Sequence, residues 1–220
     1  QQTSSNVLLH KVLDGFHSLQ GSPSELWKCY TLKFLDSYAY FSFSIIFTLF
    51  LTSDFGFSDV HAGTIYGAWG ALITLFGLLA GCIVDNLGVA RSLRVGFVLT
   101  FVSRCMICFT TSRTVLLFNV CGLLPMGSCL GIPVLATGIR RYTTSGNRGF
   151  AFGLFYVIMN VAALLSGPVV DACTIFFKSA ENAVLVEHYN LTGYRIVILT
   201  GTVANFVAVC FAATVREIKI

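Results

Sequence analysis

The chain alternates long apolar runs with short polar linkers. A membrane-spanning helix needs about 20 mostly apolar residues, and six stretches meet this requirement. They cover about residues 29–52, 60–84, 93–111, 114–138, 149–177 and 195–215. Only 178–194 forms a longer polar loop, and short connections place successive helices antiparallel. The pattern predicts an all-α membrane protein with an up-and-down six-helix bundle over residues 28–220 and an N-terminal arm over 1–27.

Two interpretations of the N-terminal arm stay open. The segment "VLLHKVLDGF", residues 7–16, places Val7, Leu8, Val12 and Phe16 on one helical stripe. Such a stripe fits a short amphipathic helix on the membrane surface. It fits equally well an arm that docks on the bundle.

Composition supports a protein dissolved in lipid. Hydrophobic residues make up 55% of the chain and charged residues 11%, whereas about a quarter of a soluble domain is charged. The net charge is only +4, and the Lys and Arg residues do not cluster in one basic stripe. Both observations argue against nucleic-acid binding. The pair in "CMIC", 105–108, has neither a second pair nor a nearby His. We therefore expect neither a metal nor a cofactor.

Basic residues near the span ends predict the orientation of the bundle. One side holds Lys11, Lys28, Arg91, Arg94, Arg140, Arg141, Arg148, Arg216 and Lys219, and the other holds Arg113, Lys178 and Arg195. The first side is therefore expected in the cytoplasm, with both termini. The sequon "NLT" makes Asn190 a candidate glycosylation site in the longest loop, outside the cell or in a lumen.

The linker "GCIVDNLGVARSLR", residues 81–94, carries an unusual acid. Gly88 permits a tight turn, and Arg91 suits a surface of anionic lipid heads. Asp85 at the end of a membrane helix needs a basic side chain or the free N–H groups of another helix as a partner. An acid that finds this partner in only one arrangement of the bundle acts as a conformational latch.

This linker resembles the signature between the second and third helices of the major facilitator superfamily. Gly81, Asp85, Gly88 and Arg91 match it, while Asn86, Val89 and Ala90 stand where bases are usual. The resemblance implies that the chain is the N-terminal half of a twelve-helix fold. It also implies that the turn locks the outward-open state from the cytoplasmic side.

Two further motifs extend the resemblance. The fourth span shows Asn119 where the family usually has arginine, and Gly167 and Pro168 are similar to an element that kinks the fifth helix. The segment "FGLFYVIMNVAAL", 152–164, is similar to a motif of the proton-coupled oligopeptide transporters. Phe155, Tyr156 and Asn160 match it, whereas Met159 and Ala162 do not, and Lys33, Asp36 and Ser37 replace the subfamily's E-x-x-E-R residues.

Two charged residues lie deep in predicted spans. Asp36 and Arg104 stand at similar depths in helices that run the same way, since each residue of a helix adds about 1.5 Å. They are expected either to pair or to line a wet cavity; Lys33, one turn from Asp36, competes for the pair. A salt bridge without a substrate role remains an alternative. Tyr38, Tyr156 and Asn160 are further substrate-cavity candidates, or else form interhelical hydrogen bonds.

These features predict a secondary active transporter of small solutes that works by alternating access. Its expected partners are a small-molecule substrate with a coupled proton or ion, the lipid bilayer and a second six-helix half in the same or another chain. The alternative is a transporter-like subunit that serves as a scaffold or receptor. Enzymatic activity is not expected, because no catalytic motif occurs and the four His residues lie outside the span centres.

Overall fold

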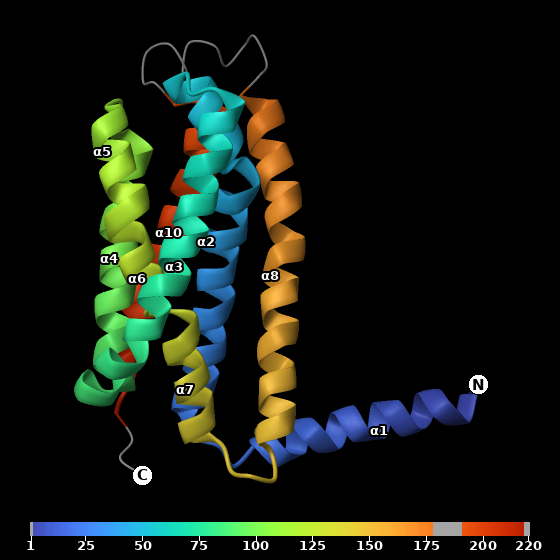
Figure 1. Ribbon diagram of the computed structural model, residues 1–220. Helices are drawn as coiled ribbons and strands as arrows, with labels where there is room; N and C mark the ends of the chain where they lie inside the picture. The colour runs from blue at the N-terminus through green and yellow to red at the C-terminus, as the bar shows by residue number, and fades with distance from the viewer. Residues whose placement is uncertain (1, 178–190, 218–220) are drawn as a thin grey trace.

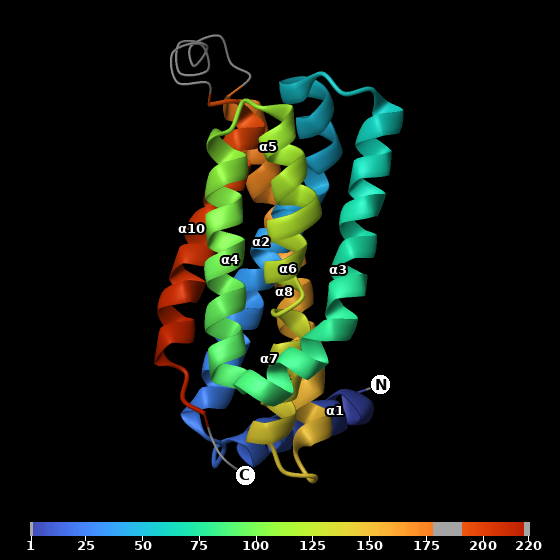
Figure 2. The same cartoon turned by 60° about the vertical axis from the view of Figure 1, so that its left-hand side comes forward.

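The computed structural model describes residues 2–177 and 191–217, and this part of the chain is helical (Figures 1 and 2). Among the described residues, six helical spans are long and apolar enough to cross a membrane, which confirms the predicted all-α six-helix bundle. The arm forms helix α1 (Gln2–Leu19). Four of the spans are single helices: α2 (Ser24–Phe55), α3 (Asp59–Leu87), α4 (Val89–Phe109) and α8 (Arg148–Phe176). The last span is α10 (Gly193–Thr214), and the fourth is divided into shorter pieces.

The fourth span differs from the single helix expected over 114–138. It consists of α5 (Arg113–Phe118), a π-helical turn η1 (Asn119–Leu123), α6 (Leu124–Ser128), a short break and α7 (Ile132–Tyr142). Pro125 and Pro133 lack the N–H that a continuous helix would use. Gly131 precedes α7 and lies in the break. By contrast, α8 continues as one helix through Pro168.

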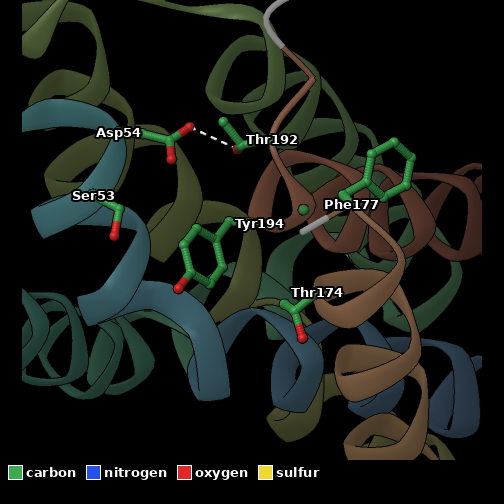
Figure 3. A pocket seen from close by; sticks show the side chains of 7 residues that line it. Ser53, Asp54, Thr174, Phe177, Thr192 and Tyr194 are labelled. Carbon is green, nitrogen blue, oxygen red and sulfur yellow. Dashed lines mark hydrogen bonds between the residues drawn. The ribbon is translucent and has the colours of Figure 1, made fainter. Parts of the chain in front are cut away.

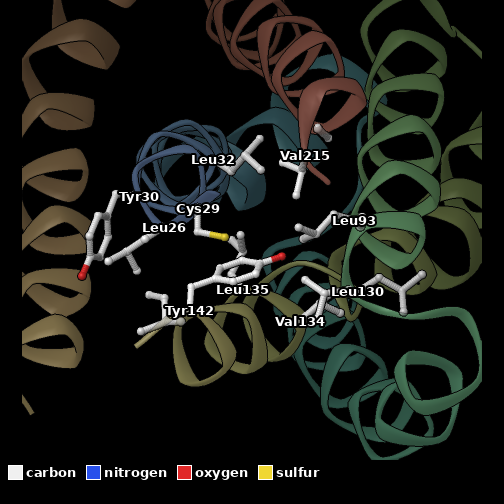
Figure 4. Close-up of a cluster of buried hydrophobic side chains, with 14 of the residues drawn as sticks. Leu26, Cys29, Tyr30, Leu32, Leu93, Leu130, Val134, Leu135, Tyr142 and Val215 are labelled. Carbon is white, nitrogen blue, oxygen red and sulfur yellow. The ribbon is translucent and has the colours of Figure 1, made fainter. Parts of the chain in front are cut away.

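Helix α2 lies at the centre of the bundle and contributes side chains to two apolar clusters. Near its start, Leu26 belongs to a buried cluster with Leu93 of α4 and Leu135 of α7 (Figure 4). Near its end, Phe47 and Phe50 belong to a second buried cluster. A polar layer of buried or half-buried side chains separates the two clusters. This layer contains the candidate site.

Two helices leave much of their apolar surface uncovered. Only 17% of the most apolar stretch of α3 and 22% of that of α8 are buried, against 50% for α4. Leu78 of α3 and Leu164 of α8 are each 74% exposed. In a bilayer, such faces contact lipid or another helix bundle.

We call the end of the bundle where α2 starts and α10 finishes the basic end. Its described cations are Lys28, Arg91, Arg94, Arg140, Arg141, Arg148 and Arg216. Helix α1 lies across this end, crosswise to the spans (Figure 1). Phe16 packs edge-on against Phe150 of α8 at 5.2 Å between ring centroids, and Asn147 donates to the carbonyl of Ser18. These contacts are those of a docked arm, while Val12 and Leu13 stay exposed.

Candidate functional site

A small polar cavity lies inside the bundle, between the two apolar clusters. Its volume is about 30 Å³, which is room for about one water molecule. Four spans contribute polar side chains to it, and the break in the fourth span borders it. The lining residues are Asp36, Tyr40, Ile73, Thr100, Arg104, Ser128, Ile132 and Asn205.

Two glycines make room for the charged residues of this cavity. A Cβ atom at Gly131, in the break before α7, would lie 3.2 Å from Asp36 Oδ2. A Cβ atom at Gly201 of α10 would lie 3.4 Å from Arg104 Nη1. The interrupted fourth span and the glycine of α10 therefore let one carboxylate and one guanidinium sit within a tightly packed bundle.

Arg104 is buried without its full set of acceptors. Its exposed fraction is 4%, and Nε and Nη1 find no hydrogen-bond acceptor among the residues that the structure describes. Its guanidinium lies 5.3 Å from the ring centroid of Phe43 and interacts electrostatically with Asp36. An unsatisfied buried donor costs about 1–3 kcal/mol, more when charged. Such a group is retained at a cost to stability, which points to a use beyond packing.

The cavity has one direct hydrogen bond across it, from Asn205 Nδ2 of α10 to Thr100 Oγ1 of α4, at 2.6 Å. The ion pairs among the described residues lie elsewhere, so Asp36 and Arg104 line one cavity without a nitrogen–oxygen distance of 4 Å or less. The two residues thus share a cavity and form no ion pair, and a wet cavity with a substrate role stays a prediction. A water molecule there would satisfy the free donors of Arg104.

Lys33 adds a second buried cation to the polar layer. Its side chain is 0% exposed and its Nζ lies 4.7 Å from the ring centroid of Phe155 on α8. Its electrostatic partner Asp36 is one turn away on α2, yet within the described chain Nζ has no hydrogen bond. The layer therefore places two cations around one carboxylate.

The other candidate cavity residues do not join Asp36 and Arg104. Tyr38 donates to Thr200 Oγ1 of α10 at 2.9 Å, an interhelical hydrogen bond. Tyr156 of α8 is 57% exposed, and Asn160 bonds the carbonyl of Tyr156 within the same helix. Tyr156 and Asn160 share the uncovered surface of α8, away from the cavity.

The turn predicted to carry the latch is a single residue, Gly88. It lies between the last residue of α3 and the first residue of α4, and its φ is +80°. Asp85 and Arg91 are exposed, and no polar contact of Asp85 occurs within the described ranges. Sequence reasoning missed the acid that does contact this turn, Glu217, because it lies far along the chain.

A second arginine is buried at the end opposite the basic end. Arg195 of α10 donates from Nε to Asp54 Oδ2 at 2.9 Å and from Nη1 to the carbonyl of Cys108 at 2.7 Å. Thr192 also donates to Asp54 at 2.9 Å, beside a cavity of about 240 Å³ (Figure 3). We call Asp54, Thr192 and Arg195 the outer clamp. The nearby glycosylation candidate Asn190 lies outside the described residues.

Within the described part of the chain, no group of three or more His, Cys, Asp or Glu side chains converges.

The family model named Major Facilitator Superfamily matches residues 29–217. The chain belongs to the Major Facilitator Superfamily. Two curated relatives are dipeptide and tripeptide permeases B. The chain is 24% identical over 184 residues to that of Aeromonas hydrophila, covering 80% of this chain and 34% of the relative. It is 26% identical over 201 residues to that of Photorhabdus asymbiotica, covering 89% and 38%.

Solved structures of peptide transporters show the same fold. The peptide transporter POT in complex with alafosfalin aligns with a TM-score of 0.74 at 19% identity, over 90% of this chain and 39% of that one. A proton-dependent oligopeptide transporter aligns with a TM-score of 0.76 at 18% identity, over 89% and 42%. The chain thus spans less than half the length of these proteins, and its bundle is a six-helix half of the major facilitator fold.

Proposed function

We propose that this chain is the N-terminal half of a secondary active transporter that moves small solutes by alternating access. The observation that carries the proposal is Arg104, a buried cation with free donors that faces Asp36 across a cavity. The site lies at the middle of the spans, beside an interrupted helix. Secondary transporters place their solute and ion sites at this depth, next to broken helices.

A second six-helix half completes the proposed transport unit. The uncovered apolar surfaces of α3 and α8 supply the area against which it packs. Asp85 is exposed at the basic end and has room to meet the first N–H groups of a helix from that half. The excess of Lys and Arg at the basic end supports a cytoplasmic position for it.

The relatives suggest which solutes to test first. Those described above are named as permeases of dipeptides and tripeptides. A short peptide carries a carboxylate and an ammonium group. The two cations and one carboxylate of the polar layer, Lys33, Arg104 and Asp36, offer complementary charge to such a solute, with a proton or another ion as the coupling species.

Uptake by cells that express the complete gene product tests this proposal. Short peptides, amino acids, sugars and nucleosides are supplied at two external pH values. We expect uptake of one class above that of control cells, and its loss in Arg104→Gln but not in Arg140→Gln. Arg140 is an exposed arginine at the basic end and serves as the matched control. Protein that reaches the membrane yet takes up no class would favour the scaffold alternative.

A further inference from the structure

The last residue of α10 and the three residues after it are fastened to three other helices at the basic end. We call residues 214–217 the C-terminal strap. Three successive main-chain carbonyls of the strap accept hydrogen bonds from long side chains of α2, α4 and α7. The bonds run from Lys28 Nζ to Thr214 at 2.8 Å, from Arg94 Nη2 to Val215 at 3.2 Å and from Tyr142 Oη to Arg216 at 3.3 Å.

An apolar contact anchors the strap between these hydrogen bonds. Val215 is 1% exposed and belongs to the same buried cluster as Leu32 and Leu93. Figure 4 shows its side chain pointing into that cluster from the end of α10. The position of the next two residues is therefore set by packing as well as by hydrogen bonds.

Glu217 uses this position to cap helix α4. The first N–H groups of a helix need acceptors from outside the helix. The residue before α4 is Gly88, which has no side-chain oxygen to offer. Glu217 takes over this role, because its carboxylate accepts from the N–H of Val89 at 3.2 Å and of Ala90 at 2.8 Å. Negative charge is favourable at a helix start.

The same carboxylate ties the fourth span to the turn. Arg141 at the end of α7 donates from Nη1 to Glu217 Oε1 at 3.0 Å. Gly88 is shaped to admit the carboxylate, since a Cβ atom at this position would lie 2.8 Å from Glu217 Cδ. Its φ of +80° also favours glycine.

Two carboxylates thus meet the turn between α3 and α4 from different sides. Glu217 is bound within its own bundle, whereas Asp85 is exposed near the end of α3. We propose that Glu217 is a positioning residue for the latch: it fixes the α3–α4 turn, so that Asp85 is presented to the second half. This inference rests on the proposed function for the role of Asp85.

Hydrogen–deuterium exchange of the complete protein tests whether Glu217 fixes the turn. Glu217→Gln replaces one of the two acceptor oxygens with an NH2 group and removes the negative charge at the helix start, so it should speed exchange in residues 88–93 by roughly three- to tenfold. Arg216→Gln is the matched control, because its exposed side chain is removed while its bonded carbonyl stays. Arg141→Gln should have a smaller effect than Glu217→Gln. Equal exchange in Glu217→Gln and the wild-type protein would overturn the proposal.

Labelling of Cys82 by a maleimide in the purified protein tests the link to Asp85. Cys82 is exposed one turn before Asp85 on α3, and a Cys210→Ser background removes the other exposed cysteine of the described residues. Asp85→Asn and Glu217→Gln should each raise the labelling rate, by at least about threefold, as the basic end opens. The double variant should label no faster than Asp85→Asn alone. Additive rates would show that Glu217 does not act through Asp85.

The two measurements separate the failure of this inference from that of the proposed function. Exchange that responds to Glu217→Gln, with Cys82 labelling the same in all variants, would retain the cap and reject the latch role of Asp85. Exchange that ignores Glu217→Gln, with labelling that responds to Asp85→Asn, would retain the latch and reject Glu217 as its positioning residue.

Discussion

Two buried arginines each face a different aspartate of α2: Arg195 faces Asp54, and Arg104 faces Asp36. The surroundings of the two arginines differ. Arg195 in the outer clamp is 3% exposed, and its guanidinium bonds both Asp54 and a main-chain carbonyl. Arg104 at the cavity is 4% exposed, and two of its nitrogens are unbonded within the described residues. Burial is nearly the same, so the hydrogen bonds are what distinguish the two sites.

We propose that this difference separates a structural role from a functional one. The outer clamp satisfies its charges and joins α2, α4 and α10 at one end of the bundle. The cavity leaves charge unsatisfied at the middle of the membrane, where it costs stability. A fully bonded pair has nothing left to offer a solute, whereas Arg104 has donors to spare. The comparison predicts that variants of the clamp change stability and variants of the cavity change transport.

The largest expected effect is on the stability of the outer clamp. Asp54→Leu leaves Arg195 buried without its carboxylate, and we expect the free energy of unfolding to fall by about 3–5 kcal/mol. Denaturation of the purified protein in detergent measures this loss. The double variant Asp54→Leu with Arg195→Leu should recover most of it, because no uncompensated charge remains. A single variant as stable as the wild type would show that the clamp does not hold the helices.

The next effect is on transport at the cavity. Arg104→Gln should lower uptake about tenfold or more, which corresponds to about 1.4 kcal/mol. The same variant should lose less than half the stability lost by Asp54→Leu, since no ion pair within 4 Å is broken. Uptake and denaturation are measured on the same preparations. Normal uptake with a large loss of stability would make Arg104 a second structural clamp.

A smaller effect is expected at the hydrogen bond that crosses the cavity. Thr100→Val keeps the shape of the side chain but removes the oxygen that accepts from Asn205 Nδ2. Asn205 is only 1% exposed, so water does not replace that acceptor freely. We expect a loss of about 1 kcal/mol in the free energy of unfolding. Val of similar size fills the same space, so cavity formation does not contribute. No loss of stability would indicate that Asn205 finds another acceptor in the cavity.

The smallest effect concerns Tyr38, outside both sites. Its hydroxyl bonds Thr200, which also bonds a carbonyl within its own helix. Tyr38→Phe should therefore cost only about 0.6 kcal/mol, the average for such a bond between membrane helices. Uptake should stay within twofold of wild type in the same assay. A tenfold loss of uptake would move Tyr38 from the helix interface to the solute path.

The spans were predictable because lipid imposes one rule on every helix that crosses it. Apolar runs of sufficient length placed all six, and equal depth in helices of the same direction was enough to bring Asp36 and Arg104 together. The prediction was wrong about the continuity of the fourth span. The sequence does contain signals of that break, namely Pro125, Gly131 and Pro133. A hydropathy average over a window of residues does not register them.

Contacts between distant segments were not predictable from local pattern. Asp54 reads as a polar linker residue and Arg195 as a charge at a span end, and only the packing of α2 against α10 pairs them. Glu217 meets Val89 and Ala90 for the same reason. Whether Tyr156 and Asn160 face a solute depends on residues of a second half.

The shape of the cavity depends on glycine at position 131. A single methyl group at this position would stand 3.2 Å from the oxygen of Asp36 and force the carboxylate to move within a space of about 30 Å³. Descendants of this protein with alanine here would keep every span and every apolar contact. The neighbouring oxygens would have to shift by a few tenths of an ångström, and under the proposed function this shift alone would weaken the carrier.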